Sequence, residues 1–139
     1  NEPDIAYAHL FSYFRGEEWR TQKETQRLLD KYFTTKPNGI PGNDDTGTMS
    51  AWAIFNMIGF YPDCPGLPEY TLTTPVFNKV TIRLDPKWYK EKELVIESNR
   101  TQPGTLYINK VLLNGKKFNQ YRITHDELVH SQRILFDLK

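Results

Sequence analysis

The hydrophobic residues of this chain recur at helical spacing over roughly the first sixty positions and at alternate positions further on. The helical spacing predicts three helices, at about residues 3–15, 21–33 and 48–58. The alternating spacing from about residue 70 onward predicts a series of short β-strands. We therefore expect a helical segment followed by an antiparallel β-sheet or half of a sandwich, which is an α+β fold.

Capping residues help to locate the ends of these helices. Pro3 suits a first helical turn, and Gly16 is expected to end the first helix. Thr21 with Glu24 matches a capping box, which predicts that the second helix opens there. Gly59 follows the third helix and suits a C-terminal cap. Each predicted helix therefore has a suitable residue at one end or the other.

The third predicted helix has very little polar surface. Its apolar residues point in nearly every direction around the helix axis, whereas a surface helix carries its apolar residues on one side. The other two helices do not offer enough partners to bury it, so we expect it to be enclosed by something larger. The residues concerned are Ala51, Trp52, Ile54, Phe55, Met57 and Ile58.

A proline-rich segment at residues 61–68 separates the two patterns and is the expected boundary. Beyond it, Asn114–Gly115 is the strongest hairpin signal in the chain. Thr124 and Glu127 match a capping box on a short helical turn. Strands are expected around residues 70–74, 80–84, 94–97, 106–108, 111–113, 121–123 and 133–138.

Composition excludes several classes of function. The 18 basic and 17 acidic residues leave a net charge of +1, which gives no electrostatic surface for nucleic acid or for a membrane. No apolar run is long enough to span a bilayer. Cys64 is the one cysteine, so an internal disulfide is excluded. The chain opens on Asn1-Glu2-Pro3 without an initiator methionine, and we expect a piece of a longer protein.

A glycine-bounded loop at residues 42–47 carries two adjacent carboxylates, Asp44 and Asp45, directly before the third predicted helix. Glycines permit backbone conformations that other residues resist, and the helix start offers free N–H groups. Such a loop can hold acids in the fixed geometry that general acid–base chemistry or hard-metal binding requires. The alternative is that the two aspartates only cap the helix, and the residues alone favour that interpretation.

These motifs together resemble glycoside hydrolase family 92, whose members are calcium-dependent, exo-acting α-mannosidases. The glycine loop and the start of the helix after it are the most specific part of the resemblance. The similarity extends over essentially the whole chain. It rests on residues 42–52, 59–62 and 64–66, and also on residues 1–3, 19–22, 111–116 and 123–126.

The resemblance implies that the chain is the C-terminal portion of a longer enzyme with an N-terminal β-sandwich and an (α/α)6 barrel. Residues 1–66 would be the last helices of the catalytic barrel, and residues 67–139 would form a C-terminal antiparallel β module. The remainder of the same polypeptide is then the expected partner of this chain. This agrees with the third helix being too apolar for its local surroundings.

The resemblance also implies an inverting mechanism, in which one carboxyl group protonates the leaving oxygen and another activates a water on the opposite face. It assigns the general base to Asp45, with Asn43 and Asp44 as assisting positions. The family's loop often has Glu where this chain has Asp44, which shortens the reach by one methylene. The general acid, a glutamate in the family, lies upstream, so the isolated chain is expected to be inactive.

A calcium ion that binds the mannose hydroxyls is a further implication of the resemblance. Asn1 and Glu2 resemble the segment that lines the calcium and sugar site, so both are candidate metal ligands and Glu2 is also a candidate for substrate binding. The expected substrate is a mannose-containing oligosaccharide such as an N-glycan, and α-1,2 is the usual linkage. The expected location is the periplasm, the cell surface or the medium of a bacterium, with no nucleic-acid partner.

Two other functions stay open for the β half. It could be a carbohydrate-binding module that stacks sugars on exposed aromatic side chains, or a purely structural module that supports a barrel. The two differ in whether the candidate aromatic residues face outward together. Those residues are Tyr70, Trp88, Tyr89, Tyr107 and Tyr121.

Overall fold

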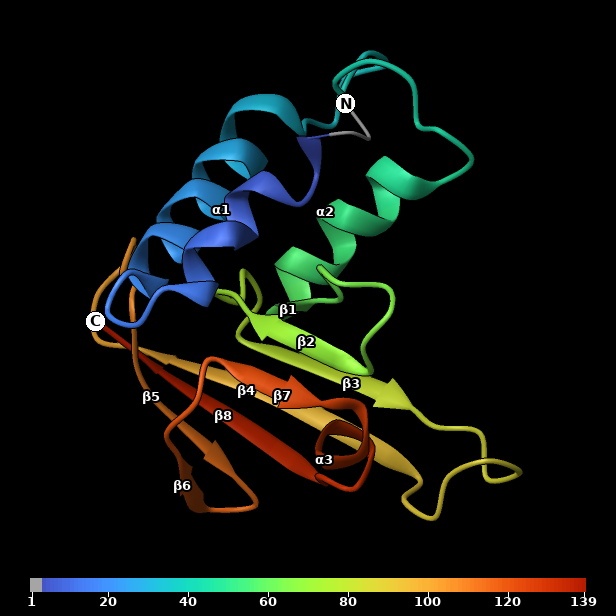
Figure 1. Cartoon of the computed structure of the whole chain (residues 1–139), viewed down its shortest axis with the longest axis vertical. Coiled ribbons are helices and arrows are strands. Elements are labelled where there is room, and N and C mark those ends of the chain that lie inside the picture. The colour runs from blue at the N-terminus through green and yellow to red at the C-terminus, as the bar shows by residue number, and fades with distance from the viewer. Residues whose placement is uncertain (1–3) are drawn as a thin grey trace.

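The computed structural model describes residues 4–139, with its main helices stacked on one side of two β-sheets (Figure 1). The expected helix at residues 3–15 corresponds to η2 (Tyr7–Tyr13), which is a 3-10 helix rather than an α-helix. Helix α1 (Glu18–Tyr32) packs beside it, and α2 (Thr48–Ile58) follows after a long loop. The protein is therefore mixed α+β, as the hydrophobic spacing predicts.

Helix α1 begins three residues before the predicted start. Thr21 lies inside the helix and is 1% exposed, because it belongs to the buried face that also contains Leu29. Glu24 does not reach back toward the start of the helix, since its carboxylate pairs with Arg27 at 2.7 Å. The predicted capping box at Thr21 is therefore wrong, and burial of the threonine accounts for the error.

Helix α2 has the predicted bounds. A glycine with a left-handed backbone stands at each end, with φ of 93° at Gly47 and 118° at Gly59. Trp52 and Asn56 lie on its buried side, whereas Ile54 on the other side is 56% exposed. The part of the chain that the structure describes thus covers one side of this apolar helix and leaves another side open.

Two β-sheets follow α2. The smaller sheet is antiparallel, in the order β1-β2-β7, and the larger has five strands in the order β3-β4-β8-β5-β6. The strands of the smaller sheet are β1 (Phe60–Tyr61), β2 (Glu69–Leu72) and β7 (Arg122–Thr124). Those of the larger sheet are β3 (Lys79–Arg83), β4 (Glu93–Arg100), β5 (Ile108–Leu113), β6 (Lys116–Phe118) and β8 (Arg133–Leu138).

The larger sheet contains one parallel pair, which the expected antiparallel module did not include. Strand β8 runs parallel to β4, with Val95 opposite Arg133 and Arg100 opposite Leu138. The last strand reaches this central position from β7 through the short helix α3 (His125–Val129). Alternation along a sequence fixes which face of a sheet each side chain takes, but it carries no information on strand direction.

The two sheets share one hydrophobic core. Inward-facing residues of β4 and β8 meet residues from the smaller sheet, and Phe55 and Ile58 at the end of α2 pack against the same cluster. The β half is therefore two layers joined to the helices through the C-terminal end of α2. The buried cluster consists of Phe60, Leu72, Leu94, Ile96, Ile108, Val111, Ile123, Leu128, Ile134, Phe136 and Leu138.

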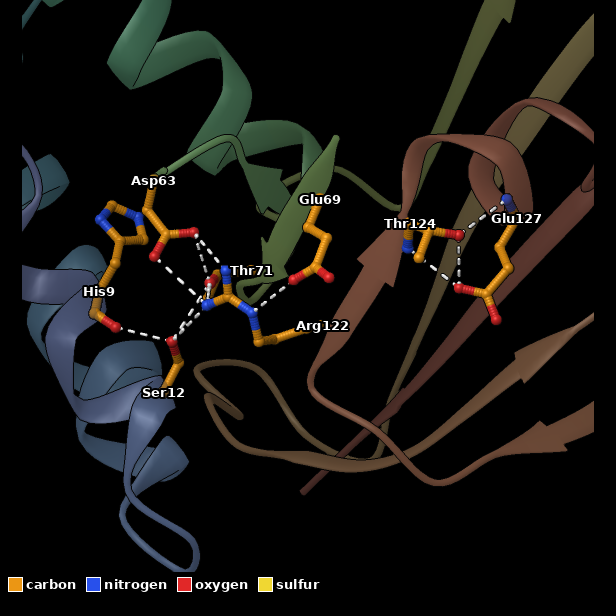
Figure 2. A network of polar contacts seen from close by, with 8 residues as sticks. All are labelled: His9, Ser12, Asp63, Glu69, Thr71, Arg122, Thr124 and Glu127. Atoms are coloured by element: carbon orange, nitrogen blue, oxygen red, sulfur yellow. Dashed lines mark hydrogen bonds and ion pairs between the residues drawn. The ribbon is translucent and has the colours of Figure 1, made fainter. Parts of the chain in front are cut away.

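The two local turn signals of the β half are confirmed. Asn114 and Gly115 join β5 to β6 with φ angles of 49° and 81°, and positive values at both positions are characteristic of a type I′ turn. The Thr124 hydroxyl accepts a hydrogen bond from the Glu127 N–H at 3.1 Å (Figure 2). The Glu127 carboxylate accepts one from the Thr124 N–H at 2.9 Å, which completes the capping box of α3.

A polar network occupies the junction between the helices and the smaller sheet (Figure 2). Arg122 of β7 lies 3.4 Å from the Asp63 carboxylate and 3.2 Å from that of Glu69, and it donates to the Thr71 hydroxyl at 3.0 Å. Ser12 of η2 lies 3.2 Å from the same Thr71 hydroxyl. The Asp63 side chain is 2% exposed. The proline-rich segment is therefore packed into the protein at this point.

Candidate active-site loop

The loop before α2 lies at the end of that helix away from the sheets (Figure 1), and it holds its acidic residues on an unusual backbone. Asp45 and Thr46 have φ angles of 49° and 60°, and Gly47 follows at 93°. Left-handed angles are uncommon outside glycine, and a β-branched residue such as threonine is a true outlier there. Residues strained in this way cost on the order of 1–3 kcal/mol each and cluster at functional sites.

Asp44 holds the first turn of α2. Its Oδ1 accepts hydrogen bonds from both the N–H and the hydroxyl of Ser50, each at 2.8 Å. Its backbone carbonyl accepts from the N–H groups of Gly47 and Met49, at 3.2 and 3.1 Å. These groups are among the donors that a helix start leaves unpaired. The capping interpretation therefore holds for Asp44, and its assisting role in catalysis stays a prediction.

Asp45 is held by its backbone and not by its carboxylate. The Asp45 carbonyl accepts hydrogen bonds from the Thr48 N–H at 3.2 Å and from the Thr48 hydroxyl at 2.7 Å. Within residues 4–139 neither the Asp45 carboxylate nor the side-chain amide of the exposed Asn43 forms a hydrogen bond or an ion pair. A carboxylate with a fixed backbone and no partner is suited to take a proton from a bound water.

The N-terminal segment meets α2 close to this loop. The Trp52 indole N–H donates to the Ile5 carbonyl at 2.9 Å. A cavity of about 330 Å³ lies at this meeting point, with one carboxylate and several aromatic rings in its wall. The candidate ligands Asn1 and Glu2 precede this segment directly but lie outside the described residues. The cavity is lined by Asp4, Ile5, Leu28, Tyr32, Phe33, Pro41, Met49 and Trp52.

The oxygen atoms of the loop fit calcium only in part. The Asp45 carboxylate and the Asn43 carbonyl are hard donors of the kind that calcium prefers. Among residues 4–139, however, no three side chains of the types His, Cys, Asp and Glu lie close enough together to hold a metal ion. The remaining ligands would have to come from Asn1, Glu2 or other parts of the protein. Calcium binding therefore stays a prediction.

The aromatic side chains proposed as a sugar platform do not share one outward face. The Tyr70 and Tyr89 hydroxyls lie 2.9 and 3.4 Å from the two ring nitrogens of His125. The Tyr107 ring stands edge-on to Trp19 of α1, with ring centroids 6.2 Å apart. Two tyrosines thus face a histidine and a third faces a helix, which weakens the binding-module alternative.

Trp88 is the exception, with 72% of its surface exposed. The N–H groups of Trp88 and Tyr89 both donate to the Asp85 carbonyl at 3.0 Å, which fixes the turn between β3 and β4. The Lys87 ammonium lies 4.9 Å from the Trp88 ring centroid. One exposed ring partly covered by a lysine is a common surface feature and does not by itself make a sugar site.

Sequence reasoning missed two features of the site. The strain at Thr46 has no sequence signal, because threonine is not a residue that favours positive φ. The role of Trp52 is the second, since the apolar pattern assigned it to the core without a polar partner. Its position is indeed buried, at 2% exposed, and an indole N–H in that setting requires an acceptor.

Comparison with known proteins agrees with the resemblance to glycoside hydrolase family 92. The sequence model of the glycosyl hydrolase family 92 catalytic domain matches residues 1–139. A curated protein described as an uncharacterized secreted glycosidase of Arthroderma benhamiae is 29% identical over 126 residues, which is 91% of this chain and 16% of that protein.

Solved structures agree with this match. The chain superimposes with a TM-score of 0.90 and 32% identity on a family GH92 α-mannosidase from Bacteroides thetaiotaomicron in complex with mannoimidazole. It superimposes with a TM-score of 0.86 and 34% identity on a family GH92 inverting mannosidase from the same species. All of this chain is covered, but only 18% of each of those proteins. The chain thus spans less than a fifth of the length of each of these three relatives.

Proposed function

The chain belongs to glycosyl hydrolase family 92, and from this premise we propose that it is the C-terminal part of a calcium-dependent, inverting exo-α-mannosidase. The family assignment supports a glycosidase, and the two mannosidase structures support mannose as the sugar. One of those two relatives is an inverting mannosidase, which supports the stereochemical course. The preferred linkage that we propose is α-1,2, in mannose-containing oligosaccharides such as N-glycans.

The observation that carries this proposal is the different bonding of two adjacent aspartates. Asp44 uses its carboxylate to cap α2, and the loop backbone then presents the Asp45 carboxylate without a partner among residues 4–139. We assign the role of general base to Asp45. It would take a proton from the attacking water as the oxygen forms its bond to the anomeric carbon.

The other half of the reaction requires groups outside this chain. An inverting glycosidase needs a second carboxyl group about 6.5–9.5 Å from the first, which protonates the leaving oxygen. We propose that this acid is a glutamate in the upstream part of the protein, so that the isolated chain does not turn over substrate. Calcium, when bound, would hold the sugar hydroxyls; Asn1 and Glu2 are its proposed ligands in this chain.

The experiment is hydrolysis of an aryl α-mannoside and of α-1,2-mannobiose by the full-length protein. Wild type, Asp45→Asn and Asp44→Asn are compared, each with and without EGTA. We expect Asp45→Asn to lower kcat by about 10²–10⁴-fold with an unchanged thermal midpoint. NMR of the fresh product should show the β-anomer of mannose first, as inversion requires. Full activity of Asp45→Asn would return the loop to helix capping alone.

The β half has a structural role in this proposal. Its core receives the end of α2, and the side-chain Oε1 of Gln22 in α1 accepts a hydrogen bond from the Ile108 N–H at 2.9 Å. Such contacts support a module that holds barrel helices in place, in preference to a module that binds sugars on its own surface. We therefore expect no mannoside binding by the β half alone.

We propose a location outside the cytoplasm, in the periplasm, on the cell surface or in the medium. The support is a curated relative that is described as a secreted glycosidase. No helix within residues 4–139 is both long enough and apolar enough to cross a membrane. Fractionation of the cells that make the full-length protein, followed by immunoblotting, tests this location.

A further inference from the structure

Two hydrogen bonds connect residues 5–9 to the buried side of α2. We call the bond nearer the start of α2 the upper rung, the other the lower rung, and the pair the ladder. In the upper rung, the Trp52 indole N–H donates to the Ile5 carbonyl at 2.9 Å. In the lower rung, the His9 Nε2 lies 3.0 Å from the Asn56 side-chain carbonyl. The partners are four residues apart on both sides, so the two segments run alongside each other in a fixed register.

The lower rung has a defined polarity. The Asn56 side-chain amide donates to the Trp52 carbonyl at 2.8 Å, so the carbonyl end of Asn56 faces His9 and accepts from its Nε2–H. His9 is 0% exposed and stacks on Tyr61, with ring centroids 4.6 Å apart. The second ring nitrogen, Nδ1, has no partner within residues 4–139. The lower rung therefore holds a neutral imidazole.

The upper rung is the one nearest to the acidic loop. Trp52 stands one helical turn after Thr48, whose N–H and hydroxyl hold the Asp45 carbonyl. Ile5, its acceptor, lines the cavity together with Asp4 and Met49. The Trp52 ring is also stacked on Phe33, with centroids 5.4 Å apart and planes at 18°. The indole is thus fixed on its face and at its edge.

From this arrangement we infer that Trp52 is a positioning residue that sets the distance between the N-terminal segment and the acidic loop. The inference rests on the proposed function, because it treats the two segments as opposite walls of one catalytic site. Trp52 touches neither aspartate in the structure. It acts through the Ile5 carbonyl on one side and through the first turns of α2 on the other.

The lower rung gives a comparison that separates positioning from stability. Asn56 lies four residues further along α2, which is about 6 Å along the helix axis. Its backbone carbonyl accepts a hydrogen bond from the Thr73 hydroxyl at 3.2 Å, so the lower rung connects to the β half. Loss of the lower rung should loosen the helix–sheet junction without moving the loop.

The experiment compares Trp52→Phe with two controls in the full-length protein. Trp52→Phe keeps an aromatic ring and removes the indole donor. Trp19→Phe makes the same chemical change at an indole that is 42% exposed, and His9→Phe removes the lower rung. All are assayed for kcat and KM on an aryl α-mannoside, at a temperature where each variant is folded.

We expect Trp52→Phe to lower kcat about tenfold, because small misplacements of catalytic groups are costly. Trp19→Phe and His9→Phe should keep kcat within about twofold, although His9→Phe lowers the thermal midpoint. An unchanged kcat for Trp52→Phe overturns the inference. So does a fall in kcat that merely follows the loss of stability in all three variants.

A second readout separates this inference from the proposed function. Amide hydrogen exchange of a peptide covering residues 42–48 should be faster in Trp52→Phe than in wild type and unchanged in His9→Phe. A wild-type protein that does not hydrolyse α-mannosides refutes the proposed function, and the exchange experiment then still tests the ladder. Equal exchange of residues 42–48 in Trp52→Phe and wild type overturns the ladder even if the mannosidase activity is confirmed.

If Trp52→Phe does not fold, the same exchange measurement is made on Phe33→Leu, which removes the stacking that fixes the indole and should also speed exchange.

Discussion

The two ends of helix α2 differ in how closely they are packed and in the strain of the backbone beside them. Its N-terminal end carries the loop with the strained backbone, and its C-terminal end runs through Gly59 into the core of the sheets. Both ends have a glycine in the left-handed region. A Cβ added to Gly47 would meet nothing within 4 Å, whereas one added to Gly59 would lie 2.8 Å from Pro75 Cγ. One end is open and the other is closely packed.

Under the proposed function, this difference separates the stabilising end of α2 from the end that carries the candidate general base. Burial in the shared core holds the C-terminal end, and hydrophobic burial supplies most of the free energy of folding. The N-terminal end buries Met49 and Trp52, but the loop before it is largely exposed and keeps a carboxylate without a partner in the described part of the chain. Active sites commonly occupy the less stable parts of a structure, which rigid parts hold in position.

The largest effect is expected from a cavity at the packed end. Phe136 of β8 is 1% exposed and lies against Gly59, so Phe136→Ala should lower the free energy of unfolding by about 3–5 kcal/mol. Trp88→Ala on the turn between β3 and β4 is the control, because 72% of that residue is exposed. Urea denaturation of the full-length protein measures both. Equal losses would contradict the importance of the packed end.

A somewhat smaller effect is expected from the polar network at the same end. Arg122→Met removes the cation beside Asp63, whose side chain is 2% exposed, and leaves a buried carboxylate without its partner. We expect a loss of about 2–3 kcal/mol, since Arg122 itself is 21% exposed. Asp63→Asn in the Arg122→Met background should restore part of that loss in urea denaturation. No recovery would mean that the arginine acts by packing on Tyr13 instead.

The network also shows where sequence reasoning stops. Signals between adjacent residues were interpreted correctly: the Asn114–Gly115 turn and the Thr124–Glu127 capping box form as expected. Each depends on groups within four positions of one another, which the chain brings together locally. The Thr21–Glu24 pattern has the same form, but tertiary burial of Thr21 overrides it. Local rules hold where no packing competes with them.

Contacts across long separations could not be predicted. His9 and Asn56 are 47 positions apart, and Arg122 and Asp63 are 59 apart, with no motif to link either pair. The same limit applies within the acidic loop at residues 42–47. The sequence placed Asp44 and Asp45 in one acidic pair, but only the three-dimensional position of Ser50 shows which carboxylate is engaged. Family resemblance supplied the assignment of Asp45, and physical patterning supplied the loop.

The two glycines of α2 allow the comparison to be tested directly. Gly59→Ala adds a methyl group against Pro75 on a left-handed backbone, so both overpacking and backbone strain contribute, together about 2–3 kcal/mol. Gly47→Ala adds backbone strain alone, about 1 kcal/mol, but strains the loop that holds Asp45. Thermal midpoints and kcat are measured for both. We expect the larger fall in midpoint for Gly59→Ala and the larger fall in kcat for Gly47→Ala.

The smallest effect is a pH dependence of the free energy of unfolding. It comes from His9, which contacts Asn56 on the buried side of α2, between the two ends of that helix. Burial lowers the pKa of His9, and the Asn56 side chain, the nearby Asp63 carboxylate and the Ile5 backbone oppose this only in part, while Arg122 adds to it. The unfolded chain therefore binds a proton at His9 more readily than the folded protein does. Stability is fully present above about pH 6.5, the usual pKa of histidine, and declines as the pH falls below it.

His9→Gln should remove this decline, because a glutamine amide can donate to the Asn56 carbonyl but does not titrate. The measurement is the difference in urea midpoint between pH 7.5 and pH 5.0, in wild type and in the variant. His130→Gln is the matched control, since the side chain of His130 is 57% exposed at the end of α3. An equal difference in all three proteins would mean that His9 is protonated without cost, and that the side of α2 between its two ends is open to water after all.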